Sequence, residues 1–250
     1  MSQGLPATAA MLAIGDELLS GRTKDRNIGH LAEVLTMAGI DLKEVRIVGD
    51  EPHIIADTLN TLRRQYDYVF TSGGIGPTHD DITADAVAAA FALPIDEHPE
   101  AVALLSDHYA RREMPFTEAR RRMTRTPKGA ALIDNPVSVA PGFRIENVFV
   151  MAGVPDVFKA MLGKVVEGLP QGRAVQSVAI PCPYGEGDIG DPLRELAKRH
   201  EGVVIGSYPK FDGKHYSTEI VLRARDDAAL GEAAKDVRRM LAEMDDTKRV

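Results

Sequence analysis

The amino-acid sequence predicts an α/β protein with a mostly parallel sheet and helices on both of its faces, followed by a small α+β domain. Short apolar runs alternate three times with helical patterns at the start of the chain, as in folds built from right-handed crossovers. Each run ends in Gly with acidic or further Gly residues. The pattern changes after a stretch of Gly and Pro, so we expect a first domain over residues 1–170 and a second over 171–250.

The first three strands and helices are predicted by apolar runs and by their end signals. Asn27 is typical of an N-cap, and the apolar positions 28, 31, 34 and 35 after it fall on one helical face. Gly39 ends this helix, and Pro52 suits the first turn of the next one. The predicted elements are strand Ala9–Ile14, the helix from Asn27, strand Leu42–Val48, a helix from Pro52 to about Tyr66, and strand Tyr68–Thr71.

The remaining elements follow from the same signals. In the first domain we expect helices Asp85–Leu93 and His98–Arg112, strand Val148–Met151, and a helix from Pro155 to about Val166. In the second we expect strand Ala174–Ile180, helix Pro192–His200, strands Val203–Ser207 and Thr218–Ala224, and helix Ala228–Met244. Gly168, Pro170 and Gly172 form the expected hinge.

Composition excludes several classes of protein. With 30 Lys and Arg against 37 Asp and Glu, the net charge is −7, which argues against general nucleic-acid binding. Cys182 is alone, so an intrachain disulfide and a Cys-based zinc site are excluded, as is typical of a reducing cytosol. No apolar run approaches the roughly 18 residues of a membrane span, and the N-terminus lacks the basic region of a secretory signal. We expect a cytoplasmic protein that binds neither nucleic acid nor a membrane.

A Gly-rich segment after the third strand is the strongest local signal. Residues 71–83 read TSGGIGPTHDDIT. Glycines let backbone N–H groups approach a ligand, so such a loop can hold a phosphate against a helix N-terminus. The alternative is a tight turn in which Asp81 or Thr83 only caps the next helix. The residues expected to bind the ligand here are Ser72, Gly73, Gly74, Ile75, Gly76 and Thr78.

Carboxylates follow the same strands, whose carboxyl ends meet at one edge of a parallel sheet. Mg²⁺ favours one or two carboxylates together with substrate phosphates, so Asp16, Asp50, Asp80 and Asp81 are the candidate ligands of a divalent metal. A cation would also offset the repulsion between acidic groups and a phosphate. The alternative is that these are solvated loop charges and caps, an interpretation that has more weight for Glu17 and Glu51 than for Asp81.

Three further features are candidates for parts of a site. Histidine as a residue type changes charge near neutral pH, so His79 is a candidate ligand, general acid or hydrogen-bond donor, with a plain loop hydrogen bond as the favoured alternative. The basic stretch 111–128 either attracts the polyanionic tail of a ligand or, as favoured, is a solvated helix face. Asn135 lies in a rigid loop that could close one side of a pocket, and Pro155 begins the last helix of the first domain.

Taken together, five motifs resemble the N-terminal domain of competence/damage-inducible protein A, within the molybdenum-cofactor-biosynthesis (molybdopterin-binding) superfamily. They are residues 14–22 (IGDELLSGR), 48–51 (VGDE), 71–83, 135–143 (NPVSVAPGF) and 152–155 (AGVP). Their order over about residues 9–168 makes the likeness specific. The tail to residue 250 is similar to shorter members of this group and to the molybdopterin-binding-like domain of FAD synthases.

This resemblance implies a three-layer α/β/α fold whose Gly-rich loop holds the phosphate of a pterin or nucleotide, in a homo-oligomer of two or three chains. For the competence-protein and FAD-synthase branches it implies metal-dependent hydrolysis of ADP-ribose or FAD, and in the molybdopterin-handling members residues matching Asp50 and Asp81 lie at the site of metal insertion or adenylyl transfer. On chemical grounds Asp81, Asp50 and His79 are the catalytic candidates, with a carboxylate or His79 as the base toward water. The deamidase activity of longer members is not expected. Two departures stand out: Ser138 and Val139 replace a common Gly-Thr, and Arg26 replaces a small hydroxylated residue.

Three functional hypotheses remain open from the sequence. The first is a metal-dependent pyrophosphatase with Mg²⁺, Mn²⁺ or Co²⁺, and the carboxylates favour it. The second is a protein that binds a pterin or nucleotide without hydrolysing it. The sequence separates these two hypotheses poorly, because both need the same glycines. The third is an adenylyltransferase of molybdenum cofactor synthesis, which is the least favoured.

Overall fold

The computed structural model describes residues 6–211, 213 and 216–248, and the chain divides into two compact units, Met1–Gly172 and Arg173–Val250. The first unit contains a six-stranded sheet in the order β2-β1-β3-β8-β7-β6. The first four of these strands run parallel and the last two antiparallel. Their bounds are β1 (Thr8–Ile14), β2 (Asp41–Val48), β3 (Tyr68–Ser72), β6 (Ala131–Ile133), β7 (Gly142–Ile145) and β8 (Val148–Met151).

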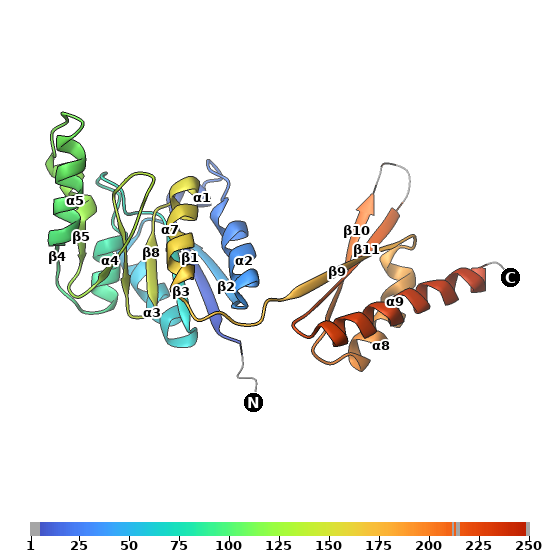
Figure 1. The fold of residues 1–250 in the computed structure, drawn as a ribbon. Helices are drawn as coiled ribbons and strands as arrows, with labels where there is room; N and C mark the ends of the chain where they lie inside the picture. Colours follow the sequence, from blue (N-terminus) through green and yellow to red (C-terminus); the bar gives the residue numbers. More distant parts are fainter. Residues whose placement is uncertain (1–5, 212, 214–215, 249–250) are drawn as a thin grey trace. The chain divides into compact units, whose positions relative to one another are not determined.

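Helices cover both faces of this sheet, which confirms the predicted α/β class (Figure 1). Side chains alternate along a strand, so Met11 of β1 packs in one core cluster and Leu12 in the other. The Met11 cluster includes α2 (Asn27–Ala38) and α7 (Pro155–Glu167). The Leu12 cluster includes α3 (Pro52–Gln65) and α4 (Thr83–Ala90). The apolar runs of β1, β3 and β8 are therefore strands buried on both faces, whereas the edge strand β2 leaves Val45 and Ile47 exposed.

Several short elements of the first unit were not predicted. They are α1 (Asp16–Leu19), β4 (Ile95–Glu97), α6 (Glu118–Arg121), the 3₁₀ helix η1 (Arg122–Thr124) and β5 (Arg125–Pro127), together with β6 and β7. The four strands among them have only three or four residues each and, unlike the uninterrupted apolar run of β8, show little pattern in the sequence. The expected helix at His98 is α5 (Pro99–Ala110), and the strand pair β4–β5 lies near it (Figure 1). Within the basic stretch 111–128, residues 118–127 form α6, η1 and β5.

The second unit is a three-stranded antiparallel sheet in the order β10-β11-β9, packed against two helices. Its elements are β9 (Gln176–Cys182), α8 (Glu186–Arg199), β10 (Val204–Phe211), β11 (Tyr216–Ala224) and α9 (Asp227–Lys248). The prediction that α8 begins at Pro192 is wrong, because burial of Ile189 outweighs the cost of a proline inside the helix. Among the described residues, none of the helices has both the length and the hydropathy of a membrane span.

Asn27 joins α2 to the ends of two strands. The prediction that it is the N-cap is wrong: it is the first residue of α2, and the Ile28 N–H is capped instead by Asp25 Oδ1 at 2.8 Å. The Asn27 side chain is buried and donates to Ser72 Oγ at 2.7 Å and to the Gly153 carbonyl at 2.8 Å. This amide fixes the positions at which β3 and β8 end.

A second asparagine holds the loop between β6 and β7. Asn135 Oδ1 accepts the N–H groups of Val137 and Ser138, both at 3.1 Å. Its Nδ2 donates to Ser138 Oγ at 2.6 Å and to the Ala140 carbonyl at 2.7 Å. Within this loop Val139 has φ of +68°, a left-handed conformation that is strained for a β-branched residue.

We expect Asn27→Ala to lower the free energy of unfolding by about 1–3 kcal/mol, because it leaves the buried Ser72 hydroxyl and the partly buried Gly153 carbonyl without this donor. Denaturant unfolding followed by circular dichroism measures this. Asn60→Ala, which removes an amide oxygen that accepts from Arg63 Nε on α3, is the matched control and should cost less. Equal losses in the two variants would contradict the role given to Asn27.

We expect Val139→Gly to raise the free energy of unfolding by about 0.5–1 kcal/mol, since glycine relieves the left-handed strain but loses more chain entropy. Denaturant unfolding is again the measurement. Val137→Gly lies in the same loop outside the positive-φ region and should lower stability instead. A destabilised Val139→Gly variant would show that packing of this side chain outweighs its strain.

Candidate functional site

The ends of the parallel strands form the candidate site. Backbone hydrogen bonds join neighbouring ends: the Gly15 N–H donates to the Val48 carbonyl at 3.0 Å, and the Gly73 N–H donates to the Met151 carbonyl at 3.1 Å. The loops after β1, β2, β3 and β8 therefore lie side by side at one edge of the sheet. In α/β folds this edge is where ligands bind.

Two predicted metal ligands, Asp16 and Asp50, are held together by their own backbones. The Asp16 N–H donates to Asp50 Oδ2 at 3.0 Å, and the Asp50 N–H donates to Asp16 Oδ1 at 3.2 Å. Gly49 leaves room for this exchange, because a Cβ there would lie 2.4 Å from Asp16 Oδ1. The fold thus fixes two carboxylates in one place.

Negative charge accumulates at this pair. Burial raises the pKa of Asp50 above its ordinary value, and the charges of Asp16, Glu17 and Asp80 raise it further, while the hydrogen bond from the Asp16 N–H acts in the opposite sense. The ionised form of Asp50 is therefore disfavoured in the folded protein. A cation bound here would relieve this repulsion.

The donor set fits a metal that takes part of its ligands from a substrate. Among residues 6–211, 213 and 216–248, no three His, Cys, Asp or Glu side chains are grouped closely enough to hold a metal by themselves. Mg²⁺ commonly uses one or two carboxylates and completes its shell with water and phosphate oxygens. Asp16 and Asp50 are the residues that would hold it, and Asp80 lies close enough to influence the charge of Asp50.

Asp81 has a different environment from the other three aspartates. Its Oδ2 accepts the N–H of Thr78 at 2.8 Å and also the Thr78 hydroxyl. Its carbonyl accepts from Arg122 Nη2 at 3.2 Å. Asp81 therefore closes the Gly-rich loop on itself, and its predicted roles as catalytic group and metal ligand remain predictions.

The glycines of the loop are explained by contacts inside the protein. Gly73 has φ of +110°, and a Cβ there would lie 2.2 Å from the Ile14 carbonyl oxygen. Gly74 has φ of +68°, and its Cβ would lie 2.2 Å from Thr83 Oγ1. A Cβ on Gly76 would meet Asp81 Oδ2 at 2.6 Å. Backbone conformation and packing require glycine at Gly73 and Gly74, whereas the carboxylate tip of Asp81 could move away from a side chain at Gly76. The glycines at 73 and 74 are therefore not separate evidence for a phosphate.

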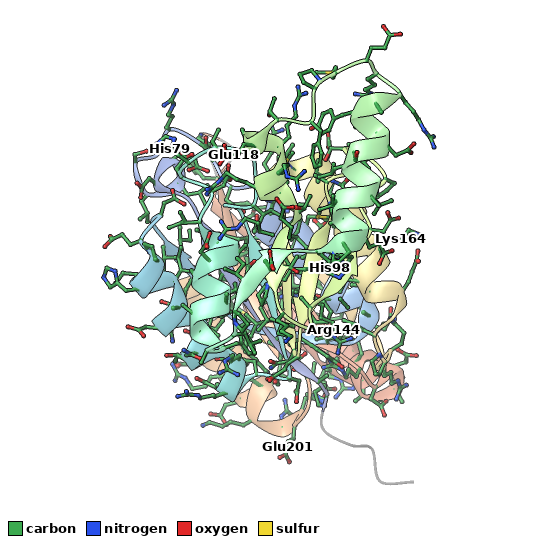
Figure 2. All side chains as sticks on the ribbon, turned by 90° about the vertical axis from the view of Figure 1, so that its left-hand side faces the viewer. His79, His98, Glu118, Arg144, Lys164 and Glu201 are labelled. Atoms are coloured by element: carbon green, nitrogen blue, oxygen red, sulfur yellow. The ribbon has the colours of Figure 1, made fainter. Side chains whose placement is uncertain are left out.

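The other predicted site residues are placed as follows. The side chain of His79 is 99% exposed on its loop (Figure 2), and its Nδ1 lies 3.9 Å from Asp80 Oδ1. Its predicted catalytic role remains a prediction. Ser72 is buried, with its hydroxyl bonded to Asn27. The amide of Asn135 is used within its own loop, and Pro155 is the first residue of α7.

A pocket beside the Gly-rich loop contains two arginines that sequence analysis assigned to a solvated helix face. It is lined by Gly74, Ile75, Asp81, Ala84, Asp85, Arg122, Met123, Arg125, Pro141 and Phe143. Arg125 makes two hydrogen bonds with Asp85, at 2.6 and 3.0 Å. The run of basic residues was visible in the sequence. That Arg122 and Arg125 line this pocket depends on the short elements η1 and β5, which the sequence did not predict.

Known proteins share both parts of the chain. Residues 10–171 match the family model "Probable molybdopterin binding domain", and residues 174–247 match "FAD synthase, middle domain". The crystal structure of CinA from Thermoplasma acidophilum, a protein of unknown function, is 28% identical with a TM-score of 0.60 and covers 65% of this chain and 97% of that one.

Two curated relatives extend over both units. A protein of Archaeoglobus fulgidus is 34% identical over 200 residues, which are 80% of this chain and 85% of the relative. The "Probable FAD synthase" of Caenorhabditis elegans is 30% identical over 94% of this chain but only 50% of its own length. The resemblance expected from the five motifs is confirmed, and the chain belongs to the family of probable molybdopterin binding domains, joined to a segment of the FAD synthase middle-domain type.

Proposed function

We propose that this chain is a metal-dependent hydrolase that cleaves the pyrophosphate bond of a dinucleotide of the ADP-ribose or FAD type. The observation that carries the proposal is the Asp16–Asp50 pair, whose uncompensated charge lies at the strand ends beside the Gly-rich loop. The match of the second unit to an FAD synthase domain supports a flavin or adenine dinucleotide as the ligand. The chain spans only half of the named FAD synthase, so synthesis of FAD is not proposed.

The proposed reaction breaks one P–O bond and forms another to a water oxygen. A bound divalent cation would withdraw charge from the phosphoryl oxygens and help to orient the attacking water. Asp16 and Asp50 hold that cation, and their backbone hydrogen bonds keep the two carboxylates in place. A carboxylate of this cluster accepts the proton from water, and the leaving phosphate keeps the bonding electrons. The products are AMP and a second phosphomonoester.

A second candidate is a protein that binds the nucleotide or pterin and leaves it intact. It is favoured by the exposure of His79 and by the lack, among the described residues, of a group of three metal-binding side chains. Both candidates use the same loops. They differ in whether AMP appears.

We expect the purified protein with Mg²⁺, Mn²⁺ or Co²⁺ to release AMP from ADP-ribose or FAD, and to stop when a chelator is added. Asp50→Asn and Asp81→Ala should each lower kcat/KM by at least about 100-fold if these groups stabilise the transition state. Asp57→Asn, an exposed aspartate of α3, is the matched control and should retain activity. Chromatography of the products gives the readout.

Two outcomes would count against hydrolysis. Absence of AMP with every metal and both substrates rejects it. Calorimetric binding of a substrate that is then recovered unchanged would establish the second candidate.

We expect Asp50→Asn to unfold at a higher temperature than the unchanged protein at pH 7 without metal. Folding raises the pKa of Asp50, so its ionised form costs stability at neutral pH, and this cost vanishes as the pH falls through the raised pKa. The advantage of the variant should therefore shrink in acid. The amide oxygen that the substitution introduces can still accept from the Asp16 N–H, which keeps the geometry.

Metal should reverse this order. The unchanged protein gains stability on adding Mg²⁺, by up to about 2.7 kcal/mol at a hundredfold excess over Kd, and the variant gains less. Thermal unfolding with and without chelator measures the stability that each of the two proteins gains from the metal. Equal gains in the two proteins would contradict a cation site at Asp50.

A further inference from the structure

Arg122 is a partly buried cation with unused hydrogen-bonding capacity. It lies at the start of η1 and lines the pocket with Gly74, Ile75 and Phe143. Its Nη2 donates to the Asp81 carbonyl at 3.2 Å, whereas its Nε is buried and has no partner among the residues that the structure describes. A buried donor left unpaired is costly, so this group is arranged for a partner that these residues do not supply.

The charge of Arg122 is also uncompensated. The neighbouring Arg125 is paired with both carboxylate oxygens of Asp85. Within the part of the chain that the structure describes, Arg122 has no carboxylate at ion-pair distance; it bonds to the backbone of Asp81, whose carboxylate is turned toward Thr78. A guanidinium has a planar fork that matches a phosphate, and it stays charged at every working pH.

Arg122 and the carboxylate pair lie on different sides of the Gly-rich loop. Asp16 and Asp50 follow β1 and β2, whereas the pocket of Arg122 includes Phe143 of β7, beyond β3 in the sheet order. The adjacent aspartates of the loop link the two places. Asp80 acts on the charge of Asp50, and Asp81 bonds to Arg122.

We infer that Arg122 binds one phosphate of a pyrophosphate-linked ligand while the cation at Asp16 and Asp50 takes the other. This assignment rests on the proposed function and specifies which ligands the site selects. The site recognises two joined phosphates and not a single one. A nucleoside monophosphate fills the cation side alone. Arg122 therefore contributes most to ligands that contain the pyrophosphate group.

The test uses the full chain with Mg²⁺ and the variants Arg122→Gln and Arg122→Lys. Calorimetry with inorganic pyrophosphate and with AMP gives the affinities. We expect Arg122→Gln to weaken pyrophosphate binding by about 10–100-fold, the range for a hydrogen bond to a charged group, and AMP binding by much less. Arg122→Lys keeps the charge and should recover part of the loss.

Arg111→Gln removes the same charge from an exposed site at the end of α5 and is the matched control. If hydrolysis is confirmed, KM for ADP-ribose or FAD should rise in Arg122→Gln more than kcat falls. A purely structural role would leave the ratio of pyrophosphate to AMP affinity unchanged, even if the melting temperature drops.

The outcomes separate this inference from the proposed function. Loss of pyrophosphate selectivity in a protein that releases no AMP supports the role of Arg122 and rejects hydrolysis. Hydrolysis with unchanged pyrophosphate affinity in both variants overturns the role of Arg122. Equal losses for pyrophosphate and AMP overturn the assignment of the two phosphates to two sides of the loop.

Discussion

The close approach of three backbones at the end of β3 is the constraint on which the site depends. A Cβ on Gly73 would lie 2.2 Å from the Ile14 carbonyl oxygen, and a Cβ on Gly153 would lie 3.2 Å from the Gly73 Cα. Asn27 then bonds to both strand ends. Because these segments touch through backbone atoms, the loops that leave them have fixed starting points. Side chains beyond them can be positioned without a bound ligand.

The carboxylate pair shows the cost of such positioning. Asp16 and Asp50 exchange backbone hydrogen bonds, which hold two like charges together, and burial adds to the unfavourable state of Asp50. A sequence selected for stability alone would remove one of the charges. Strain or repulsion retained at one place in an otherwise well-packed fold is typical of a functional site.

Sequence alone predicted the parallel strands, the covering helices and the change of pattern between the two units, because apolar runs and helical faces are bounded there by Gly, Asn and Pro. It did not predict β4 to β7, which have three or four residues each and lack such a pattern. It selected the right glycines but for a ligand, whereas Gly73 and Gly74 are needed first by the chain's own contacts. The role of Asn27 and the pairing state of Arg122 depend on partners distant in sequence, and neither residue lies in a motif that reveals it.

The distribution of charge distinguishes the two remaining functions. In a protein that only carries an anion, cationic side chains and N–H donors raise the affinity for that anion, and acidic groups lower it. Here Arg122 supplies such a donor on one side of the loop. On the other side Glu17 and three aspartates carry charge that repels an anion; the aspartates are Asp16, Asp50 and Asp80. These opposite charges are compatible when a divalent cation joins the acidic side to the ligand. Because a cation on a phosphate also favours attack by water, the arrangement that we propose for binding would also prepare the bond for cleavage.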